Sequence, residues 1–261
     1  MERLKWIAMA SAAVAVCAGA AKGDGFAASV ASYEAGTGAV AGFTDPAVAV
    51  GSPTRISGFD LRVTPFNPPF QSSEVVSIGK GGHLTLEFES LVTDDPGNPF
   101  GIDMIVFSNA FFYAEDFSAV AEHVWKPGGL VEVSLDGDDW RAVTGAVADG
   151  VFPTLGFRDT TDPFGSDGGL VPTNFRVPVD PAVSPWGKTF DELRAGYGVS
   201  GGGTGIDLAG TGLSAVRYVR ISNSGDALYA IEIDAAADVI PAPAAIATAA
   251  VGAIVMSRRR R

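Results

Sequence analysis

The 261-residue chain is poor in cysteine and histidine, two residue types that are common in catalytic and metal sites. It holds one cysteine, Cys17, and two histidines, His83 and His123. Cys17 lies within an N-terminal segment that we expect to be removed. The mature protein would then have no disulfide, no zinc–thiolate site and no cysteine nucleophile. The H-E-x-x-H pattern is absent too, which leaves no local signature of a zinc peptidase of that type.

Charge is also scarce and is mostly of one sign. Charged residues make up 18% of the chain, and 30 acidic residues against 18 basic ones give a formal net charge of −12. A body of this acidity repels phosphate backbones. The composition therefore argues against nucleic acid as a partner.

Glycine and the apolar residues are abundant, and their pattern predicts strands. The chain has 33 Gly and 16 Pro, with 47% hydrophobic residues, as expected of short strands joined by turns around a core. In residues 79–91, Leu84, Leu86 and Phe88 alternate with polar residues, the mark of a half-buried strand. Similar alternation or apolar runs predict strands at 101–107, 131–135, 140–143, 219–221 and 229–233.

These strands predict an all-β protein, an antiparallel β-sandwich of jelly-roll type spanning residues 28–237. The stretch 146–212 is rich in Gly, Pro, Asp and Thr, with a short helical candidate at 191–194. We interpret this stretch as long surface loops carried on the sandwich, without a second core.

Both ends of the chain read as targeting segments. Arg3 and Lys5, an apolar stretch at 6–16 and the small residues Ala18-Gly19-Ala20 predict a signal peptide over 1–21 with a helical apolar centre. At the other end, residues 238–261 contain a short apolar run followed by four arginines. The uninterrupted part, 244–257, would span only about 21 Å as a helix, short of the roughly 30 Å hydrocarbon core. It would therefore make only a short transmembrane helix.

The C-terminal segment resembles the PEP-CTERM sorting signal of exported Gram-negative proteins. The match consists of a proline-x-proline motif, a small-residue apolar helix and a basic end, at Pro241, Ala242, Pro243, Arg258, Arg259, Arg260 and Arg261. The resemblance implies a transient partner, an exosortase-type membrane peptidase, and delivery to the cell envelope, outer surface or extracellular matrix. Ala242 stands where the family usually has glutamate. A plain C-terminal membrane anchor is the alternative interpretation.

The body resembles a group of exported bacterial sandwich proteins that often carry the same sorting tail, and its Ser-x-Asp-Gly hairpin is similar to one seen in discoidin-like and carbohydrate-binding sandwiches. The matching pieces are "FTDPAVAVGSP" (43–53), the glycine-rich strand at 79–88, "IDMIVFSNAF" (102–111), "VEVSLDGDDW" (131–140) and "GIDLAGTGLSAVRYVRI" (205–221). In this group an acidic residue commonly precedes the asparagine of the "VFxNAF" motif, whereas this chain has Ser108. The resemblance implies a fold and a location rather than a chemistry.

Two acidic loops make Ca²⁺ the candidate cofactor, because calcium prefers hard oxygen ligands held in turns. One loop holds Asp94, Asp95 and Asp103; the other holds Asp136, Asp138 and Asp139. Neither has the spacing of an EF-hand. The alternative is that both are solvated turns, and Asp136-Gly137 is already accounted for by a hairpin.

Exposed aromatic rings are the candidate contacts for extracellular polysaccharide. The candidates are Phe112, Tyr113, Trp125 and Trp186, which the plainer interpretation assigns to packing. The resulting hypothesis is a non-enzymatic, exported adhesive protein that contacts polysaccharide with calcium support. The alternative is a carbohydrate-active enzyme, a glycoside hydrolase or lyase, which would need two convergent carboxylates in a cleft.

Overall fold

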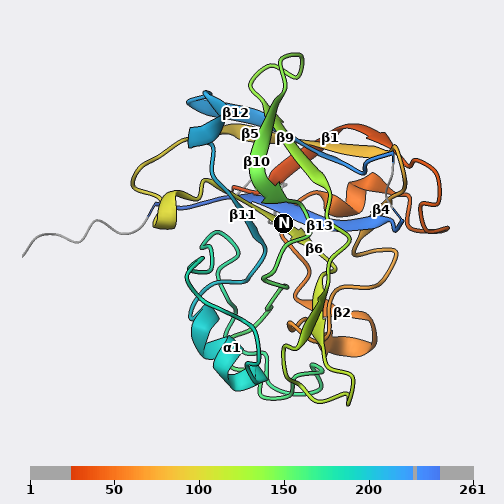
Figure 1. The fold of residues 1–261 in the computed structure, drawn as a ribbon, viewed down its shortest axis with the longest axis vertical. Coiled ribbons are helices and arrows are strands. Elements are labelled where there is room, and N and C mark those ends of the chain that lie inside the picture. The colour runs from red at the N-terminus through yellow and green to blue at the C-terminus, as the bar shows by residue number, and fades with distance from the viewer. Residues whose placement is uncertain (1–24, 226–227, 242–261) are drawn as a thin grey trace, which may run out of the picture.

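The structure is a computed structural model that describes residues 25–225 and 228–241. Its largest sheet has five strands and forms the upper layer in Figure 1. In spatial order the strands are β1 (Ala27–Glu34), β5 (His83–Thr93), β12 (Ala215–Ser222), β9 (Leu130–Ser134) and β10 (Arg141–Val147).

A second sheet of four strands lies beneath the first and completes a sandwich (Figure 1). Its order is β11 (Thr204–Ile206), β6 (Met104–Ser108), β13 (Ile231–Asp238) and β4 (Val76–Ile78). Two ribbons are separate, β2 (Ile56–Ser57) with β3 (Leu61–Arg62), and β7 (Phe111–Tyr113) with β8 (His123–Trp125). Every one of these strand pairs is antiparallel, which confirms the predicted all-β sandwich.

The main core lies between the two sheets. The alternating residues Leu84, Leu86 and Phe88 of β5 are buried in it, as predicted. The five residues of β6 are all buried because both faces of this strand are covered. Met104 belongs to the core between the sheets, whereas Phe107 packs on the opposite face against the ring of Phe175.

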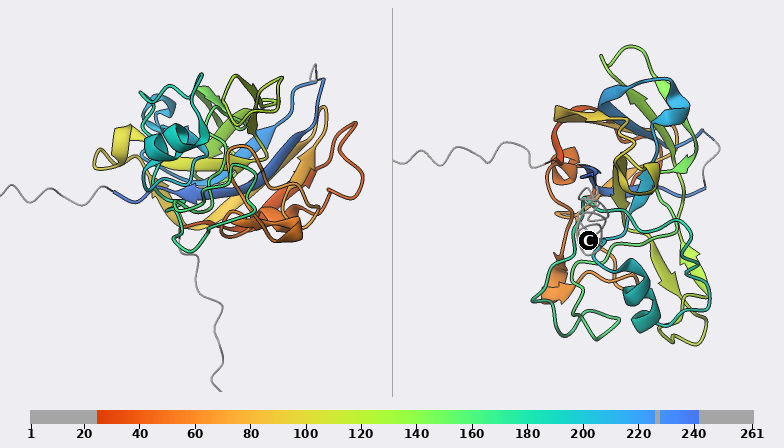
Figure 2. Two further views of the ribbon diagram at one scale, coloured as in Figure 1. Left: turned by 90° about the horizontal axis from the view of Figure 1, so that it is seen from below. Right: turned by 90° about the vertical axis from the view of Figure 1, so that its left-hand side faces the viewer.

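The stretch 146–212 does more than form surface loops, so that prediction was wrong. Residues 204–206 of this stretch form β11 in the four-stranded sheet. Much of the rest builds a lower lobe beneath the sandwich, together with ribbon β7–β8 and the segment around Phe66 (Figure 2, right). This lobe has its own hydrophobic cluster, in which Leu155, Phe190 and Leu193 are buried with Phe66. The apolar residues that build it are spaced irregularly along the chain, and no strand or helix period marks them.

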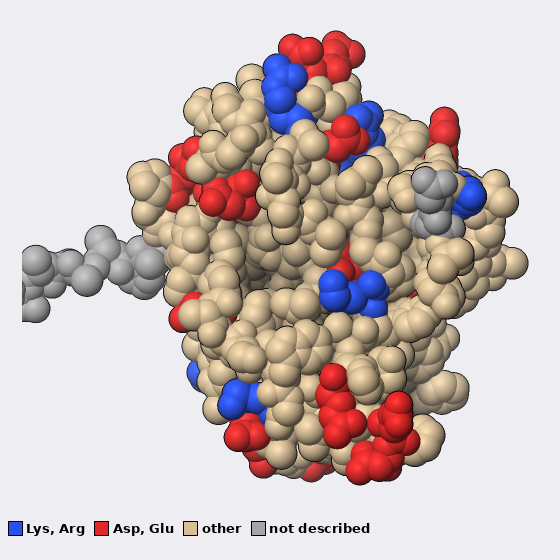
Figure 3. All heavy atoms as spheres, viewed as in Figure 1, with Lys and Arg blue, Asp and Glu red and all other residues tan. Residues whose placement is uncertain are grey.

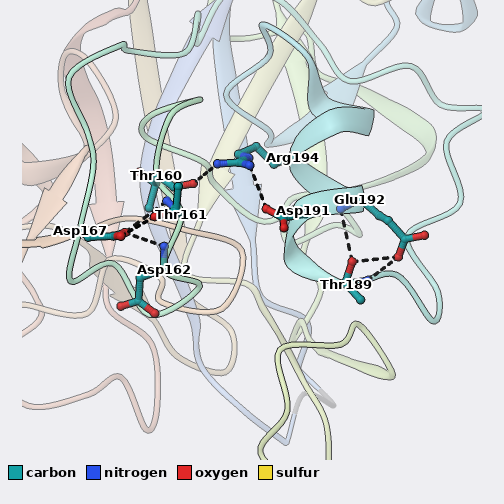
Figure 4. A network of polar contacts seen from close by, with 8 residues as sticks. All are labelled: Thr160, Thr161, Asp162, Asp167, Thr189, Asp191, Glu192 and Arg194. Atoms are coloured by element: carbon teal, nitrogen blue, oxygen red, sulfur yellow. Dashed lines mark hydrogen bonds and ion pairs between the residues drawn. The ribbon is translucent and has the colours of Figure 1, made fainter.

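The lower lobe contains the α-helix α1 (Phe190–Tyr197), which includes the helical candidate at 191–194. Its first turn is closed by a capping box: the Thr189 hydroxyl accepts the Glu192 N–H, and the Glu192 carboxylate accepts the Thr189 N–H. Figure 4 shows how Arg194 connects the helix to the loop around Thr160. Its guanidinium donates to the Thr160 carbonyl and pairs with Asp191 at 2.8 Å. Short 3-10 helices lie at η1 (Pro46–Ala49), η2 (Gly58–Asp60), η3 (Pro99–Gly101) and η4 (Ala209–Thr211).

Most of the two targeting segments lies outside the described residues. This holds for the predicted signal peptide, 1–21, and for the sorting tail from Ala242 to Arg261. Pro241 is described, as an exposed residue outside any helix or strand. Within 25–225 and 228–241, no helix is both long and apolar enough to cross a bilayer.

Candidate functional site

A groove of about 700 Å³ lies where the sandwich meets the lower lobe. The sandwich contributes Ala146 and Val147 of β10 and Thr204 of β11, and the lower lobe contributes Phe152 and residues 178–179 and 181–186. Lys126 is the one ionisable side chain among the described lining residues, which include no Asp or Glu. Figure 3 shows one face of the molecule, on which most acidic side chains lie toward the rim and a basic patch lies near the centre.

Trp186 is the aromatic residue best placed in this groove. Its side chain lines the hollow and is 50% exposed. The buried ring of Phe112 fixes it from behind, with the ring centroids 6.2 Å apart and the planes at 77°. Pro178, Pro181 and Pro185 stiffen the segment that carries it, because each proline ring fixes its own φ. The groove therefore exposes part of an indole ring that neighbouring residues keep in place.

The other three aromatic candidates lie elsewhere. Phe112 is 1% exposed and belongs to the core of the lower lobe, so its assignment as a stacking residue was wrong. It alternates along β7 with Tyr113, which is exposed and lines a smaller hollow of about 220 Å³. Trp125 is partly buried and packs edge-on against Tyr229, with centroids 5.0 Å apart.

Three carboxylates meet at one end of the sandwich, from loops that are distant in sequence. Asp94 follows β5, Asp103 precedes β6, and Asp207 follows β11; one oxygen of each lies within 4.8 Å of the others. Two of these residues were predicted as ligands, and the third was not, because its approach depends on strand pairing. Asp103 is fully buried, while Asp94 and Asp207 are exposed. Among the described residues, this is the single group of three acidic or other metal-binding side chains.

The remaining predicted ligands serve local turns. The Asp95 carboxylate accepts the Gly97 N–H at 2.8 Å, the geometry of an Asx turn. Asp136 accepts the N–H groups of Asp138 and Asp139, each at 2.9 Å, and these bonds lower the pKa of its carboxyl. The Asp136 loop is thus organised without an ion, and its acidic residues form no group of three within the described chain.

A buried polar cluster behind the groove was missed by the sequence analysis. Ser108, which replaces the acidic residue of the "VFxNAF" motif, donates to the carboxylate of Asp149 at 2.6 Å. Burial, reinforced by the charge of Glu232, raises the pKa of Asp149 to about 7. The amide of Asn109 donates to Glu232, and burial raises the pKa of that carboxyl as well. The structure thus places a carboxylate against Ser108 from a distant loop, a position that no local motif marks.

No protein-family model matches the chain, and a search of curated proteins returns no relative.

Proposed function

We propose that the protein is an exported, non-enzymatic surface protein that binds polysaccharide in the groove beside Trp186. The observation that carries this proposal is the half-exposed indole held in a hollow of about 700 Å³. Aromatic faces pack against the apolar C–H faces of sugar rings, while a few polar groups set orientation. We propose that the sandwich is of jelly-roll type, and its Ser-x-Asp-Gly hairpin is similar to one found in carbohydrate-binding sandwiches.

The lining of the groove favours a neutral or sparsely charged polysaccharide. The walls are mainly aliphatic and proline-rich, with Lys126 as the one basic side chain among the described lining residues. One cation can pair with an occasional acidic sugar. The formal net charge of −12 opposes a densely anionic polymer at longer range.

The enzymatic alternative finds less support in this groove. Hydrolysis of a glycosidic bond in the usual way needs two carboxyl groups on either side of the bond. No Asp or Glu is found among the described lining residues. The nearby carboxyl of Asp149 is fully buried and accepts a hydrogen bond from Ser108.

Binding of the exported protein to an array of bacterial surface polysaccharides tests the proposed activity. We expect a small set of related neutral or sparsely acidic glycans to bind. Absence of binding across the array, or binding that simply follows the anionic charge of the glycan, would contradict the proposal.

Delivery to the surface through the C-terminal tail is the second part of the proposal. It is supported by the proline-x-proline motif and the terminal arginines, in a segment of which only residues up to Pro241 are described. An intact-mass measurement on the exported protein reports processing at both ends at once. We expect a mass that lacks the signal peptide and Arg258–Arg261. A mature mass that retains the four arginines would favour the membrane anchor instead.

A further inference from the structure

We propose that Asp94, Asp103 and Asp207, together with the side-chain oxygen of Asn98, form a calcium site that ties the two sheets of the sandwich together at one end. The site shares no residue with the groove.

The first observation is the convergence of the three carboxylates around a fixed centre. Asp103 accepts hydrogen bonds from the Asp95 N–H at 3.1 Å, the Asn98 amide at 2.9 Å and the Leu208 N–H at 2.9 Å. These bonds hold its carboxylate in place between the two loops. Asp94 and Asp207 then bring two further negative charges to within 4.8 Å of it, an arrangement that is repulsive until a cation occupies it.

The second observation is independent of the acidic residues and concerns Asn98. This side chain is only 7% exposed, and its amide is directed at the cluster through the bond from Nδ2 to Asp103 Oδ1. Its Oδ1 is buried and has no hydrogen-bond partner. A buried polar atom without a partner is costly. A half-turn of the amide would exchange the bond from Nδ2 to Asp103 for a metal contact. Oδ1 would then face the three carboxylates, where a cation would satisfy it, and the N–H groups of Asp95 and Leu208 would still hold Asp103.

The donor set fits calcium better than the other common cations. Three carboxylates and an amide oxygen are hard ligands, and water can complete the six to eight oxygens that Ca²⁺ takes. Magnesium demands a small, near-ideal octahedron, which loops carrying two exposed ligands do not enforce. The described ligands include no histidine or thiolate to favour zinc.

The position of the site gives the ion a structural role. The loop 94–103 joins β5 to β6, and the loop 207–214 joins β11 to β12. Strands β5 and β12 belong to the five-stranded sheet, whereas β6 and β11 belong to the four-stranded sheet. An ion held by both loops therefore links the two layers, and its binding stabilises the folded chain.

Calorimetric titration of the chelator-treated, exported protein with CaCl₂ tests this inference. We expect one ion per chain, with a dissociation constant on the order of 10⁻⁴ M as in extracellular sites. At saturating calcium the melting temperature should rise by roughly 5 °C, and by less in magnesium. Absence of calcium binding, or an equal rise with both ions, would overturn the site.

Three single variants localise the ion. Asp94→Asn and Asp207→Asn each remove one charge from an exposed ligand and keep its shape, so each should weaken calcium binding at least about tenfold. In chelator both should melt at or above the parent temperature, because the repulsion is relieved; a purely structural carboxylate would give a lower value. Asp138→Asn, in the other acidic loop, is the matched control and should bind calcium as the parent does. Equal binding by all three variants would contradict the assignment.

Discussion

Two buried carboxyl groups have strongly raised pKa values in the folded protein. Burial is the main cause that raises the pKa of both Asp149 and Asp234 to about 7. Asp234 accepts hydrogen bonds from the Thr54 N–H and hydroxyl, which offset part of the effect of burial. Both groups are therefore largely protonated in the folded protein at mildly acidic pH, and ionised in the unfolded chain above its ordinary pKa.

The resulting pH dependence has a definite sign. Between about pH 4 and 7 the folded protein binds more protons than the unfolded chain, so the free energy of unfolding falls as pH rises. Each group contributes up to about 1.4 kcal/mol per pH unit within this window. Above the folded pKa of about 7 both states are ionised, and this contribution stops changing. Urea denaturation at pH 5 and pH 8 should therefore give a lower free energy of unfolding at pH 8.

Replacement of one buried acid isolates its contribution to the pH dependence of the free energy of unfolding. Asp149→Asn keeps an acceptor for the Ser108 hydroxyl but cannot ionise, so at pH 8 it should raise the free energy of unfolding by up to about 4 kcal/mol. At pH 4 it should bring no such gain, because Asp149 is protonated there. The exposed control Asp138→Asn should leave the pH profile unchanged. An equal effect of Asp149→Asn at both pH values would show that ionisation is not the cause.

At the residue scale, the sequence indicated which residue types could bind an ion or a sugar better than it indicated where in the fold they lie. Asp94, Asp103 and Trp186 were chosen as candidates because their residue types suit calcium and sugar. Asp207 and Asp149 reach their positions through strand pairing over long sequence separations, which no local pattern encodes. Asn98 lies in the same loop as Asp103, and its amide contact with Asp103 depends on the fold of that loop. Phe112 was misplaced because the alternation along β7 gives no indication of which face the lower lobe covers.

At the scale of single elements, α1 is the clearest case of a locally encoded structure. The Thr189 and Glu192 side chains satisfy N–H groups of the first turn, and its buried residues Phe190, Leu193 and Tyr197 anchor it in the lower lobe. The strands of the sandwich are encoded as clearly by alternation. Their order in space is not, because β12 and β13 follow one another in the chain yet belong to different sheets.

Loss of the helix cap should weaken the protein measurably. Thr189 is exposed, so Thr189→Ala removes its hydroxyl bonds to Glu192 with little change in packing. We expect the free energy of unfolding to fall by about 1 kcal/mol in urea denaturation. Thr189→Ser keeps the hydroxyl and should stay close to the parent. If the two variants are equally stable, the cap contributes nothing.

At the scale of the whole molecule, the two proposed binding sites lie where separate parts of the fold meet. The groove lies where the sandwich meets a lower lobe that has its own hydrophobic cluster, and the carboxylate cluster joins loops from both sheets. The sequence predicted the sandwich because its strands alternate regularly. It did not predict the lower lobe, because that cluster is built from irregular segments brought together by the fold.

The most direct test of polysaccharide binding is the dissociation constant of the best glycan from the array, measured for the parent and two variants. Trp186→Ala removes the held indole from the groove and should weaken binding at least about tenfold, since one stacking ring contributes about 1.5 kcal/mol. Phe59→Ala removes an aromatic ring that is 87% exposed and does not line the groove, and it should bind as the parent does. Unchanged affinity in Trp186→Ala, or equal weakening in both variants, would contradict the account.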